Sequence, residues 1–302
     1  MKENKNFLPL LVSRPTTIFF ELIFFGNIFI SLCAASLVQL TYLQVGLKPA
    51  LDAATVFVFG STLFIYSLHR LLVIKQTSDD EKGAIRSWAK KNAFFLVMFL
   101  ISGAGIFSLA VFHLQFTSVV LLAVLGIISM LYELPLIPFR GKMLKLRNIG
   151  ISKPVMLILV WVVSTAMIPC IEKNISLLDF RVPLIFIERI ILILFIVLSF
   201  DLRDIEFDKR EGVKTIPVLL GEEKIKKLYI VLLVIGILTS ILHYAILIHA
   251  TDLLAARIIN LLITYYIVSN KKWKRSEMYF AFFVDGCLLF QFLLTWFATL
   301  LF

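Results

Sequence analysis

Nine apolar runs of similar length divide the chain and leave few folds open to it. Each run is close to the roughly 20 residues that a helix needs to cross the hydrocarbon core of a bilayer. Hydrophobic residues make up 60% of the 302 positions, and charged residues only 17%. A soluble domain of this size has no core large enough to bury so much apolar surface. The sequence therefore predicts a multi-pass membrane protein.

The runs predict an all-α bundle of nine transmembrane helices in a single domain, residues 1–302. No internal repeat, low-complexity segment or linker divides the chain. The expected helices cover residues 16–38, 50–74, 93–112, 117–134, 154–171, 183–202, 226–247, 253–269 and 277–301.

Positive charge gathers in alternate loops. Of the 30 Lys and Arg residues, 25 lie in the N-terminal segment, in the loops after the second, fourth, sixth and eighth runs, or in the ends of the runs that adjoin these loops. The positive-inside rule then places the N-terminus in the cytoplasm and the C-terminus outside, and we expect a bacterial cytoplasmic (inner) membrane. Because the net charge of +10 belongs to one membrane face, the partner it indicates is the lipid bilayer and not a nucleic acid. Long loops on that face predict a cytoplasmic catalytic or binding cap.

The sixth run ends in a densely charged stretch, FDLRDIEFDKREGVKTIPVLLG, from Phe200 to Gly221. Asp201, Asp204 and Asp208 are spaced so that a helix would place their carboxylates on one face. Like charges this close repel one another unless a cation lies between them, and carboxylates are magnesium ligands. We therefore predict a Mg²⁺ site with Asp204 and Asp208 as catalytic ligands and Asp201 assisting. The alternative is a solvated acidic loop between two helices.

Basic residues could complete a phosphate site beside these acids. The loop between the fourth and fifth runs carries Lys145, Arg147 and Lys153, and it ends at a serine and a proline that suit the start of a helix. Lys214 follows the three aspartates in the charged stretch. Lysine and arginine together bind phosphate as a point charge and a fork. The alternative is that these charges only fix the topology.

Polar residues within the runs are further candidates for substrate binding. Tyr66, His69 and Arg70 fall on one helix face at the end of the second run, where they would face a cavity with Arg70 as an anion partner. The alternative is an interfacial aromatic beside an arginine that reaches the headgroups. Asp285, about eight residues into the ninth run, is expected to line the same cavity.

Other ionisable residues lie near the outer ends of the runs and are expected at the membrane interface. Glu188 with Arg189 belongs to this group. His113, His243 and His249 do so as well, and interfacial positions suit them better than ligand roles.

Taken together, these residues resemble the UbiA superfamily of intramembrane prenyltransferases. The specific match is the stretch DLRDIEFDKREGVKTIPVLLG after the sixth run. Supporting matches are Arg14-Pro15, Tyr132, Pro135, Arg147, Lys153, Tyr279 and Asp285-Gly286. The resemblance covers essentially the whole chain.

This resemblance implies an enzyme, a prenyltransferase that moves an isoprenoid chain from its diphosphate to an aromatic or lipid-like acceptor with Mg²⁺ as cofactor. It implies that Asp201, Asp204 and Asp208 form the second aspartate motif of the family. It also implies that Arg147 and Lys153 belong to the loop that binds the diphosphate.

The chain departs from the family at the end of the second run. The family carries a first aspartate-rich motif there, but residues Tyr66 to Lys75 read YSLHRLLVIK and contain no acid. We therefore expect one metal site, with Arg70, Arg147 and Lys153 supplying the charge of the second. The alternative is a non-catalytic homologue that binds or moves an isoprenoid lipid. A transporter is disfavoured because few Gly or Pro residues interrupt the runs.

Overall fold

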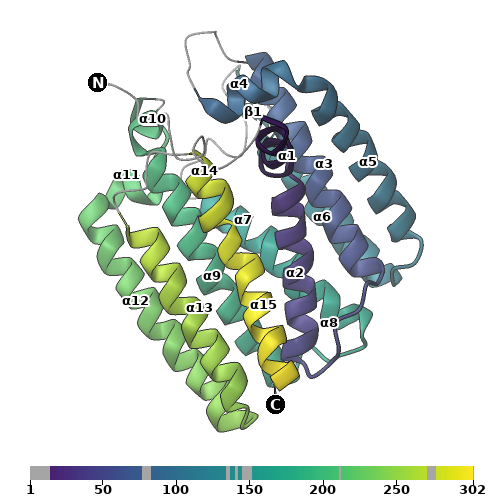
Figure 1. Cartoon of the computed structure of the whole chain (residues 1–302), viewed down its shortest axis with the longest axis vertical. Coiled ribbons are helices and arrows are strands. Elements are labelled where there is room, and N and C mark those ends of the chain that lie inside the picture. Colours follow the sequence, from purple (N-terminus) through teal and green to yellow (C-terminus); the bar gives the residue numbers. More distant parts are fainter. Residues whose placement is uncertain are drawn as a thin grey trace.

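A computed structural model describes residues 14–76, 83–133, 137–139, 142–144, 152–210, 212–270 and 277–301. The long helices stand side by side in one bundle (Figure 1). The helices are α1 (Arg14–Phe25), α2 (Ile28–Gln44), α3 (Ala53–Gln76), α4 (Ala84–Lys91), α5 (Ala93–Val111), α6 (Phe116–Glu133), α7 (Ser152–Val162), α8 (Ile168–Glu172), α9 (Arg181–Arg203), α10 (Ile205–Arg210), α11 (Ile216–Leu220), α12 (Glu222–Ser240), α13 (Thr251–Ser269), α14 (Glu277–Tyr279) and α15 (Gly286–Leu301).

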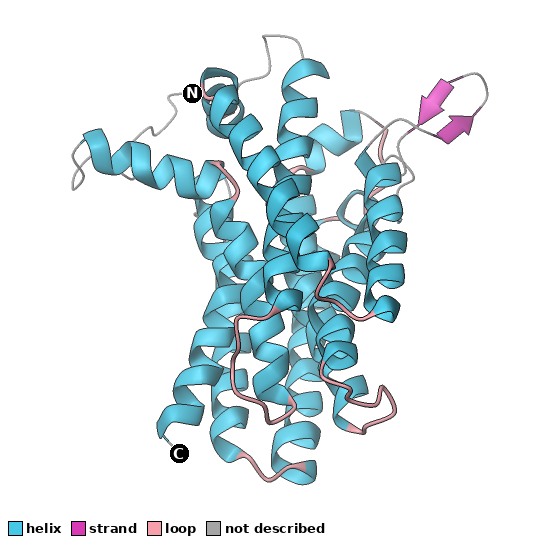
Figure 2. Ribbon diagram, turned by 90° about the vertical axis from the view of Figure 1, so that its right-hand side faces the viewer, coloured by secondary structure: helices cyan, strands magenta, loops and turns pink. Residues whose placement is uncertain are grey.

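Two features interrupt this purely helical pattern. Three π-helical turns continue neighbouring helices: η2 (Val163–Met167), η3 (Ile241–Leu247) and η5 (Phe280–Val284). A small antiparallel hairpin of β1 (Ile137–Phe139) and β2 (Lys142–Leu144) projects from one end of the bundle (Figure 2). The prediction of an all-α bundle is therefore confirmed, with this hairpin as an addition.

Seven helical segments of the described chain are long and apolar enough to cross a membrane. They are Ala53–Ile74, Ala93–Val111, Pro154–Glu172, Arg181–Arg203, Glu222–Leu247, Thr251–Ser269 and Glu277–Leu301. Each coincides with one of the nine predicted helices. The predicted helix 117–134 corresponds to α6, whose apolar part is shorter. The count of nine spans stays a prediction.

The predicted helix 16–38 is broken in two. Phe19–Phe25 of α1 and Ile28–Gln44 of α2 meet at an angle of 57°. Asn27 allows the turn because it takes the left-handed backbone conformation, with φ of 68°. Gly26 leaves no room for a side chain, since a Cβ there would lie 2.1 Å from the carbonyl oxygen of Leu22. The helix predicted over 16–38 is therefore found as two segments that meet at an angle, and the second continues to Gln44.

Helices α3 and α5 approach each other closely through two glycines. A Cβ on Gly103 would lie 2.7 Å from the backbone nitrogen of Phe64 and 2.8 Å from the carbonyl oxygen of Gly60. A Cβ on Gly60 would in turn meet Ile106 at 2.7 Å. Small residues at helix interfaces are typical of membrane bundles, where close backbone contact drives association.

Helix α9 is the most enclosed of the candidate spans, because 72% of its most apolar 18-residue stretch is buried inside the protein. Its side chains contribute to two separate buried clusters. Leu192 and Ile196 pack with α2 and α15, while Phe195 and Leu198 pack with α12 and α13. This arrangement explains why α9 is apolar on nearly every face.

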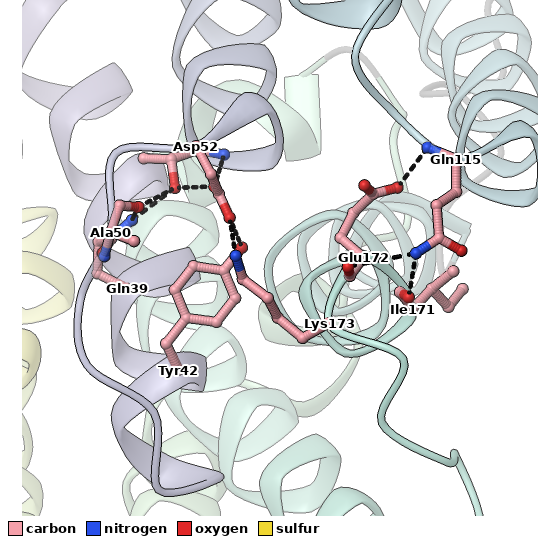
Figure 3. A network of polar contacts seen from close by, with 9 residues as sticks. Gln39, Tyr42, Ala50, Asp52, Gln115, Ile171, Glu172 and Lys173 are labelled. Carbon is pink, nitrogen blue, oxygen red and sulfur yellow. Dashed lines mark hydrogen bonds and ion pairs between the residues drawn. The ribbon is translucent and has the colours of Figure 1, made fainter.

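Polar contacts fasten the distal end of the bundle, which we define as the end formed by residues 39–55 and 171–181 (Figure 3). The Asp52 carboxylate accepts a hydrogen bond of 2.6 Å from the Tyr42 hydroxyl and pairs with the Lys173 ammonium at 2.7 Å. Its other oxygen caps α3 by accepting the Thr55 backbone N–H at 3.1 Å. The Gln115 N–H, at the start of α6, donates to the carboxylate of Glu172.

A second polar cluster lies buried between α2, α9, η3 and α13. The Glu188 carboxylate accepts hydrogen bonds from Gln44 at 2.8 Å and from the Tyr244 hydroxyl at 2.9 Å. His243 Nδ1 lies 3.0 Å from the same carboxylate, and Arg257 donates to the Glu188 carbonyl oxygen at 3.0 Å. Glu188 and His243 are at most 1% exposed. The expectation that they lie at the membrane interface is therefore wrong, because they satisfy each other inside the protein.

Arg189 extends this cluster toward α2. Its guanidinium donates to the Thr165 hydroxyl at 2.7 Å, to the Leu37 carbonyl oxygen at 3.1 Å and to the Thr41 hydroxyl at 3.1 Å. The η2 turn presents Thr165 to this guanidinium, so the interfacial expectation for Arg189 is wrong as well. Its hydrogen-bond partners among the described residues are neutral oxygens, and the neighbouring Glu188 carboxylate supplies negative charge.

Candidate functional site

A cavity of about 930 Å³ lies among the helices. Its walls come from α2, α3, α6, α7, α9, η5 and α15. Residues of α4, α10 and α14 line it at one end of the bundle, which we call the charged end (Figure 1). The interior is apolar and aromatic, with Phe29, Trp161 and Phe280 among its lining side chains.

The described lining of the charged end carries opposite charges in equal number. Four arginines and four carboxylates line the cavity: Arg70, Arg86, Arg203, Arg210, Asp201, Asp204, Glu277 and Asp285. Such a lining can form hydrogen bonds and ion pairs with a ligand, but it has no net excess of positive charge. An anionic ligand of high charge would therefore need further cations.

The three predicted residues of α3 all line the cavity. Tyr66, His69 and Arg70 lie there together, as their helical spacing implies. The Arg70 guanidinium also donates a hydrogen bond to the carbonyl oxygen of Phe25, the last residue of α1. Arginine thus satisfies a carbonyl that the end of α1 leaves unbonded, and this contact stabilises the break before α2.

The three aspartates of the charged stretch do not lie on one continuous helix. Helix α9 ends at Arg203, and α10 begins at Ile205 after Asp204. Asp201 and Asp204 line the cavity, whereas Asp208 is buried and is not a lining residue. Within the described ranges, no three His, Cys, Asp or Glu side chains come together as a metal site. The side chains as placed therefore do not form the three-carboxylate site, and magnesium binding stays a prediction.

Arg203 links the acids to the aromatic wall. Its Nε and Nη2 atoms donate to the two carboxylate oxygens of Asp204 at 2.7 and 3.0 Å. The same guanidinium lies 4.9 Å from the ring centroids of both Phe200 and Phe280. These two rings are themselves 5.2 Å apart. Aromatic faces at this place are thus already arranged to stabilise positive charge.

Asp285 lines the cavity from the last helix. The η5 turn precedes it, and its backbone N–H bonds to the carbonyl oxygen of Phe280 at 3.0 Å in the i to i−5 pattern of a π-helix. The guanidinium groups of Arg203 and Arg70 are near enough to interact electrostatically with its carboxylate.

Glu277 fastens α4 across the charged end. Its carboxylate accepts the backbone N–H of Ile85 at 2.6 Å, at the start of α4. A carboxylate at a helix N-terminus satisfies free N–H groups and interacts favourably with the helix dipole. Trp88, about one turn further along α4, packs against Phe25 of α1. Helix α4 is thus held over the cavity at both of these points.

The remaining predicted site residues lie apart from this cavity or outside the described residues. Lys214 is exposed and does not line the cavity. Lys145 and Arg147 fall outside the described residues, as does the side chain of Lys153. The predicted basic phosphate loop therefore stays a prediction.

Sequence reasoning missed several polar lining residues. The cavity is also lined by residues that were not among the predicted site residues: Asn27, Arg86, Arg203, Arg210 and Glu277. The Gly26-Asn27 dipeptide inside an apolar run was the available signal for Asn27, since this pair is typical of a chain break. Arg86 and Glu277 lie in polar segments, where no pattern distinguishes them from solvated charges.

Comparison with known proteins identifies the fold. No protein-family model and no curated protein matches the chain. Among solved structures, that of a UbiA homolog from Archaeoglobus fulgidus bound to Cd²⁺ matches with a TM-score of 0.56 and 14% sequence identity. The match covers 90% of this chain and 99% of that one. A structure of a UbiA homolog from the same organism matches with a TM-score of 0.49 and 14% identity, over 94% of this chain and 99% of that one.

The UbiA-like fold predicted from the charged stretch after the sixth run is thereby confirmed. The described helices supply seven apolar candidate spans for it. The chain is an integral membrane protein with the fold of the UbiA homologues.

Proposed function

We propose that the chain is a prenyltransferase of the UbiA superfamily, which moves a prenyl group from an isoprenoid diphosphate to a hydrophobic or aromatic acceptor. One observation carries the proposal: a cavity with a charged end and an apolar, aromatic interior lies within a bundle of this fold. The diphosphate would lie at the charged end, and the prenyl chain would occupy the apolar interior.

The residues of the charged end have separate parts in this proposal. Arg70 and Arg210 would hold the diphosphate oxygens, because guanidinium groups bind phosphate through paired N–H donors. When the C–O bond to the diphosphate breaks, an allylic cation is left beside Phe200 and Phe280. The faces of these rings would stabilise its charge. Arg203 already lies against them, which supports their suitability for a cation.

Further positive charge is needed to bind a diphosphate, because the described lining balances four arginines with four carboxylates. We propose two sources. One is the loop with Lys145, Arg147 and Lys153, and the other is Mg²⁺ bound by Asp201, Asp204 and Asp208. A homologue of the same fold was solved with Cd²⁺ bound, which supports a divalent cation. A bound cation would neutralise leaving-group charge, but the aspartates would have to move together to hold it.

The proposal is tested with the purified chain in lipid nanodiscs. We expect release of diphosphate from farnesyl diphosphate or geranylgeranyl diphosphate with Mg²⁺ present, and its loss with a chelator. Replacing both Asp204 and Asp208 with Ala should abolish Mg²⁺-dependent release. No release from any prenyl diphosphate, with the chain folded and Mg²⁺ present, would contradict the proposal.

Two neighbouring cations on α10 provide a matched pair of variants. Arg210 lines the cavity, whereas Lys209 pairs with Glu206 on the exposed side. We expect Arg210→Gln to raise the KM for the prenyl diphosphate by about tenfold, as for the loss of one charged hydrogen bond. Lys209→Gln removes the same charge outside the cavity and should leave KM within about twofold.

A second candidate function is supported by the α3 residues. Tyr66, His69 and Arg70 stand where the family carries its first acidic motif, so the chain lacks the ligands for a second metal. A homologue without catalysis would bind or move an isoprenoid lipid in the same cavity. Binding of a prenyl diphosphate without diphosphate release would favour this function over transfer.

The orientation in the membrane completes the proposal. Following the distribution of Lys and Arg, we place the charged end in the cytoplasm and the distal end outside. In intact cells, a membrane-impermeant maleimide should label a cysteine introduced at exposed Leu178 at the distal end. Labelling instead at exposed Lys209 would reverse the assignment.

A further inference from the structure

The cavity stops part-way along each of its long wall helices. Toward the distal end its last lining residues, which we call the floor, are Ile30 on α2, Ile65 on α3, Ile128 on α6, Trp161 on α7, Ile193 on α9 and Leu288 on α15. Beyond the floor, no described residue of these helices lines the cavity. Ile193 and Leu288 are only 2% and 1% exposed, so the helices have closed on one another at the floor.

Helix geometry gives the depth of the apolar interior. From Phe200 at the charged end to Ile193 at the floor, α9 rises about 10 Å at 1.5 Å per residue. From the floor to Arg181 the same helix continues for about 18 Å. The interior therefore occupies the smaller part of the length of the bundle.

This depth can be compared with the length of a prenyl chain. An extended polypeptide spans about 3.5 Å over its three backbone bonds, so an extended carbon chain gains about 1.2 Å per bond. An isoprene unit adds four chain bonds and thus about 5 Å. The interior accommodates about two isoprene units in an extended conformation, or about three when the chain is bent.

Trp161 is the largest side chain of the floor. It is only partly buried, so the indole is open to the cavity that it lines. The ring also packs against two separate buried clusters, one that includes Ile30 and Ile193 and another that includes Val58 and Leu125. Contacts with both clusters fix the position of the ring at the end of the interior.

A layer of buried polar contacts lies about one helical turn beyond the floor. The Thr165 hydroxyl donates to the Trp161 carbonyl oxygen at 2.5 Å and accepts from the Arg189 guanidinium at 2.7 Å. The same guanidinium donates to the Leu37 carbonyl oxygen of α2 at 3.1 Å. These bonds join α2, η2 and α9 directly behind Trp161 and Ile193.

The charge of Arg189 makes this layer a barrier to a hydrocarbon chain. The residue is 2% exposed, and oxygens of α2 and η2 accept its hydrogen bonds. A prenyl chain that passed the floor would separate the guanidinium from these oxygens. A buried charge without hydrogen-bond partners is costly, so the chain is stopped by electrostatics as well as by packing.

We propose that Trp161 sets the length of the prenyl chain, and that the donor is a short prenyl diphosphate of two or three isoprene units, such as geranyl or farnesyl diphosphate. This inference rests on the proposed prenyl transfer and names its donor. Trp161 is the specificity-determining residue. Arg189 and Thr165 are positioning residues, which hold the floor from behind.

Donors of different lengths test the floor. Geranyl, farnesyl, geranylgeranyl and hexaprenyl diphosphate are each supplied at the same mole fraction of the nanodisc lipid, so that partition into the bilayer does not differ. We expect kcat/KM for diphosphate release to be at least about tenfold lower for geranylgeranyl and hexaprenyl diphosphate than for farnesyl diphosphate, because extra units overpack the interior. Equal values for farnesyl and hexaprenyl diphosphate would overturn the proposal.

Two substitutions at the floor should change the length preference in opposite directions. Trp161→Ala removes the indole and should raise kcat/KM for geranylgeranyl relative to farnesyl diphosphate by about tenfold. Val160→Phe adds a ring at the neighbouring lining residue and should lower kcat/KM for farnesyl relative to geranyl diphosphate by about tenfold. Trp296→Ala, at a 42% exposed position outside the cavity lining, is the control and should leave both ratios unchanged. Unchanged ratios in both floor variants would overturn the role of Trp161.

Thr165→Val tests the layer behind the floor. Valine keeps the branched shape but lacks the hydroxyl that joins the Trp161 backbone to Arg189. We expect kcat/KM for geranylgeranyl relative to farnesyl diphosphate to rise by about threefold. Thr299→Val removes a similar bond, from an exposed hydroxyl to the Trp296 carbonyl oxygen, and should not change the ratio. A lower melting temperature of Thr165→Val with an unchanged ratio would show that Thr165 is structural and does not position the floor.

Binding without turnover separates this inference from the proposed transfer. Displacement of radiolabelled farnesyl diphosphate by the other three diphosphates, at equal mole fractions in the nanodisc, should give the same order of lengths as kcat/KM. If the protein binds in this order but releases no diphosphate, the transfer fails and the floor stands. If it releases diphosphate from all four donors equally, the floor fails and the transfer stands.

Discussion

Arg203 and Asp204, adjacent in sequence, form a two-point ion pair in which Nε–Oδ1 is 2.7 Å and Nη2–Oδ2 is 3.0 Å. Both carboxylate oxygens of Asp204 are thus occupied by a guanidinium. A cation that binds Asp204 has to displace this partner. The ion pair therefore opposes metal binding at Asp204, and the competition between the two cations can be measured.

Arg203→Gln should therefore strengthen metal binding. With its internal partner removed, Asp204 becomes available, and we expect the Kd for Mn²⁺ to fall by at least about threefold. Electron paramagnetic resonance of Mn²⁺, titrated with the substrate-free protein, measures this Kd. Arg210→Gln removes a cavity cation that is not paired with Asp204, so its effect should be smaller. An equal effect of the two variants would mean that Asp204 is no ligand.

Glu188→Gln should destabilise the protein strongly. The carboxylate is buried with His243 and Arg257, and its loss leaves buried positive charge uncompensated. Removing one partner from such a cluster costs about 3–5 kcal/mol. Thermal unfolding in detergent measures the effect. The matched control is Glu206→Gln, whose exposed ion pair with Lys209 contributes little, so its melting temperature should stay unchanged.

Gly103→Ala should loosen the contact between α3 and α5. The new methyl group would lie 2.7 Å from the Phe64 nitrogen, so the helices have to separate at a cost of about 1–3 kcal/mol. Gly105→Ala on the same helix meets no atom within 4 Å and should not destabilise. Unfolding midpoints of the two variants in detergent compare them directly. Equal midpoints would show that the glycine contact is unimportant.

Acid should weaken the distal end through Asp179. Hydrogen bonds from the Arg181 side chain lower the pKa of Asp179 from 3.8 to about 2. Since the folded pKa lies below the unfolded one, this stabilisation is complete above about pH 4 and is lost as the pH falls through about 2. Melting temperatures measured between pH 6 and pH 2 should fall along that window.

Asp179→Asn supplies the control for this acid dependence. The variant should melt lower at pH 6 and lose less stability on acidification, because it has no carboxylate to protonate. Some dependence of stability on pH should persist because of Asp52. Burial raises the pKa of this carboxyl group, but its contacts with Lys173 and Tyr42 lower the pKa by more, so the net change is a decrease. A pH profile identical to wild type would show that the Asp179 pair contributes nothing.

Hydrophobic length predicted the helices well, because crossing a bilayer imposes one length on every span. It could not reveal the break at Gly26-Asn27, since the residues on both sides are apolar and read as one run. Nor could it place Glu188 and His243. Their proximity to helix ends indicated an interface, whereas their actual partners come from distant parts of the sequence.

The candidate site was predicted where helical spacing decides it. Tyr66, His69 and Arg70 lie on one face because they are three and four residues apart. Helical spacing failed for the aspartates because α9 ends between Asp201 and Asp208, so the face that they were expected to share does not exist. The ion pair between Asp204 and its neighbour Arg203 cannot be predicted from spacing, because it depends on the rotamers that the two side chains adopt in the folded protein.

The η5 turn makes the last helix tolerant of a change in chain length at one place. A π-helical turn holds about one residue more than an α-helical turn, so deleting any one of residues 280–284 would leave the same number of turns as regular α-helix and keep the two halves near their present orientation. The same deletion in the regular helix α15 would instead rotate the two halves against each other by about 100°. Residues 280–284 are therefore the place where this helix could lose one codon and still keep Asp285 on the cavity wall.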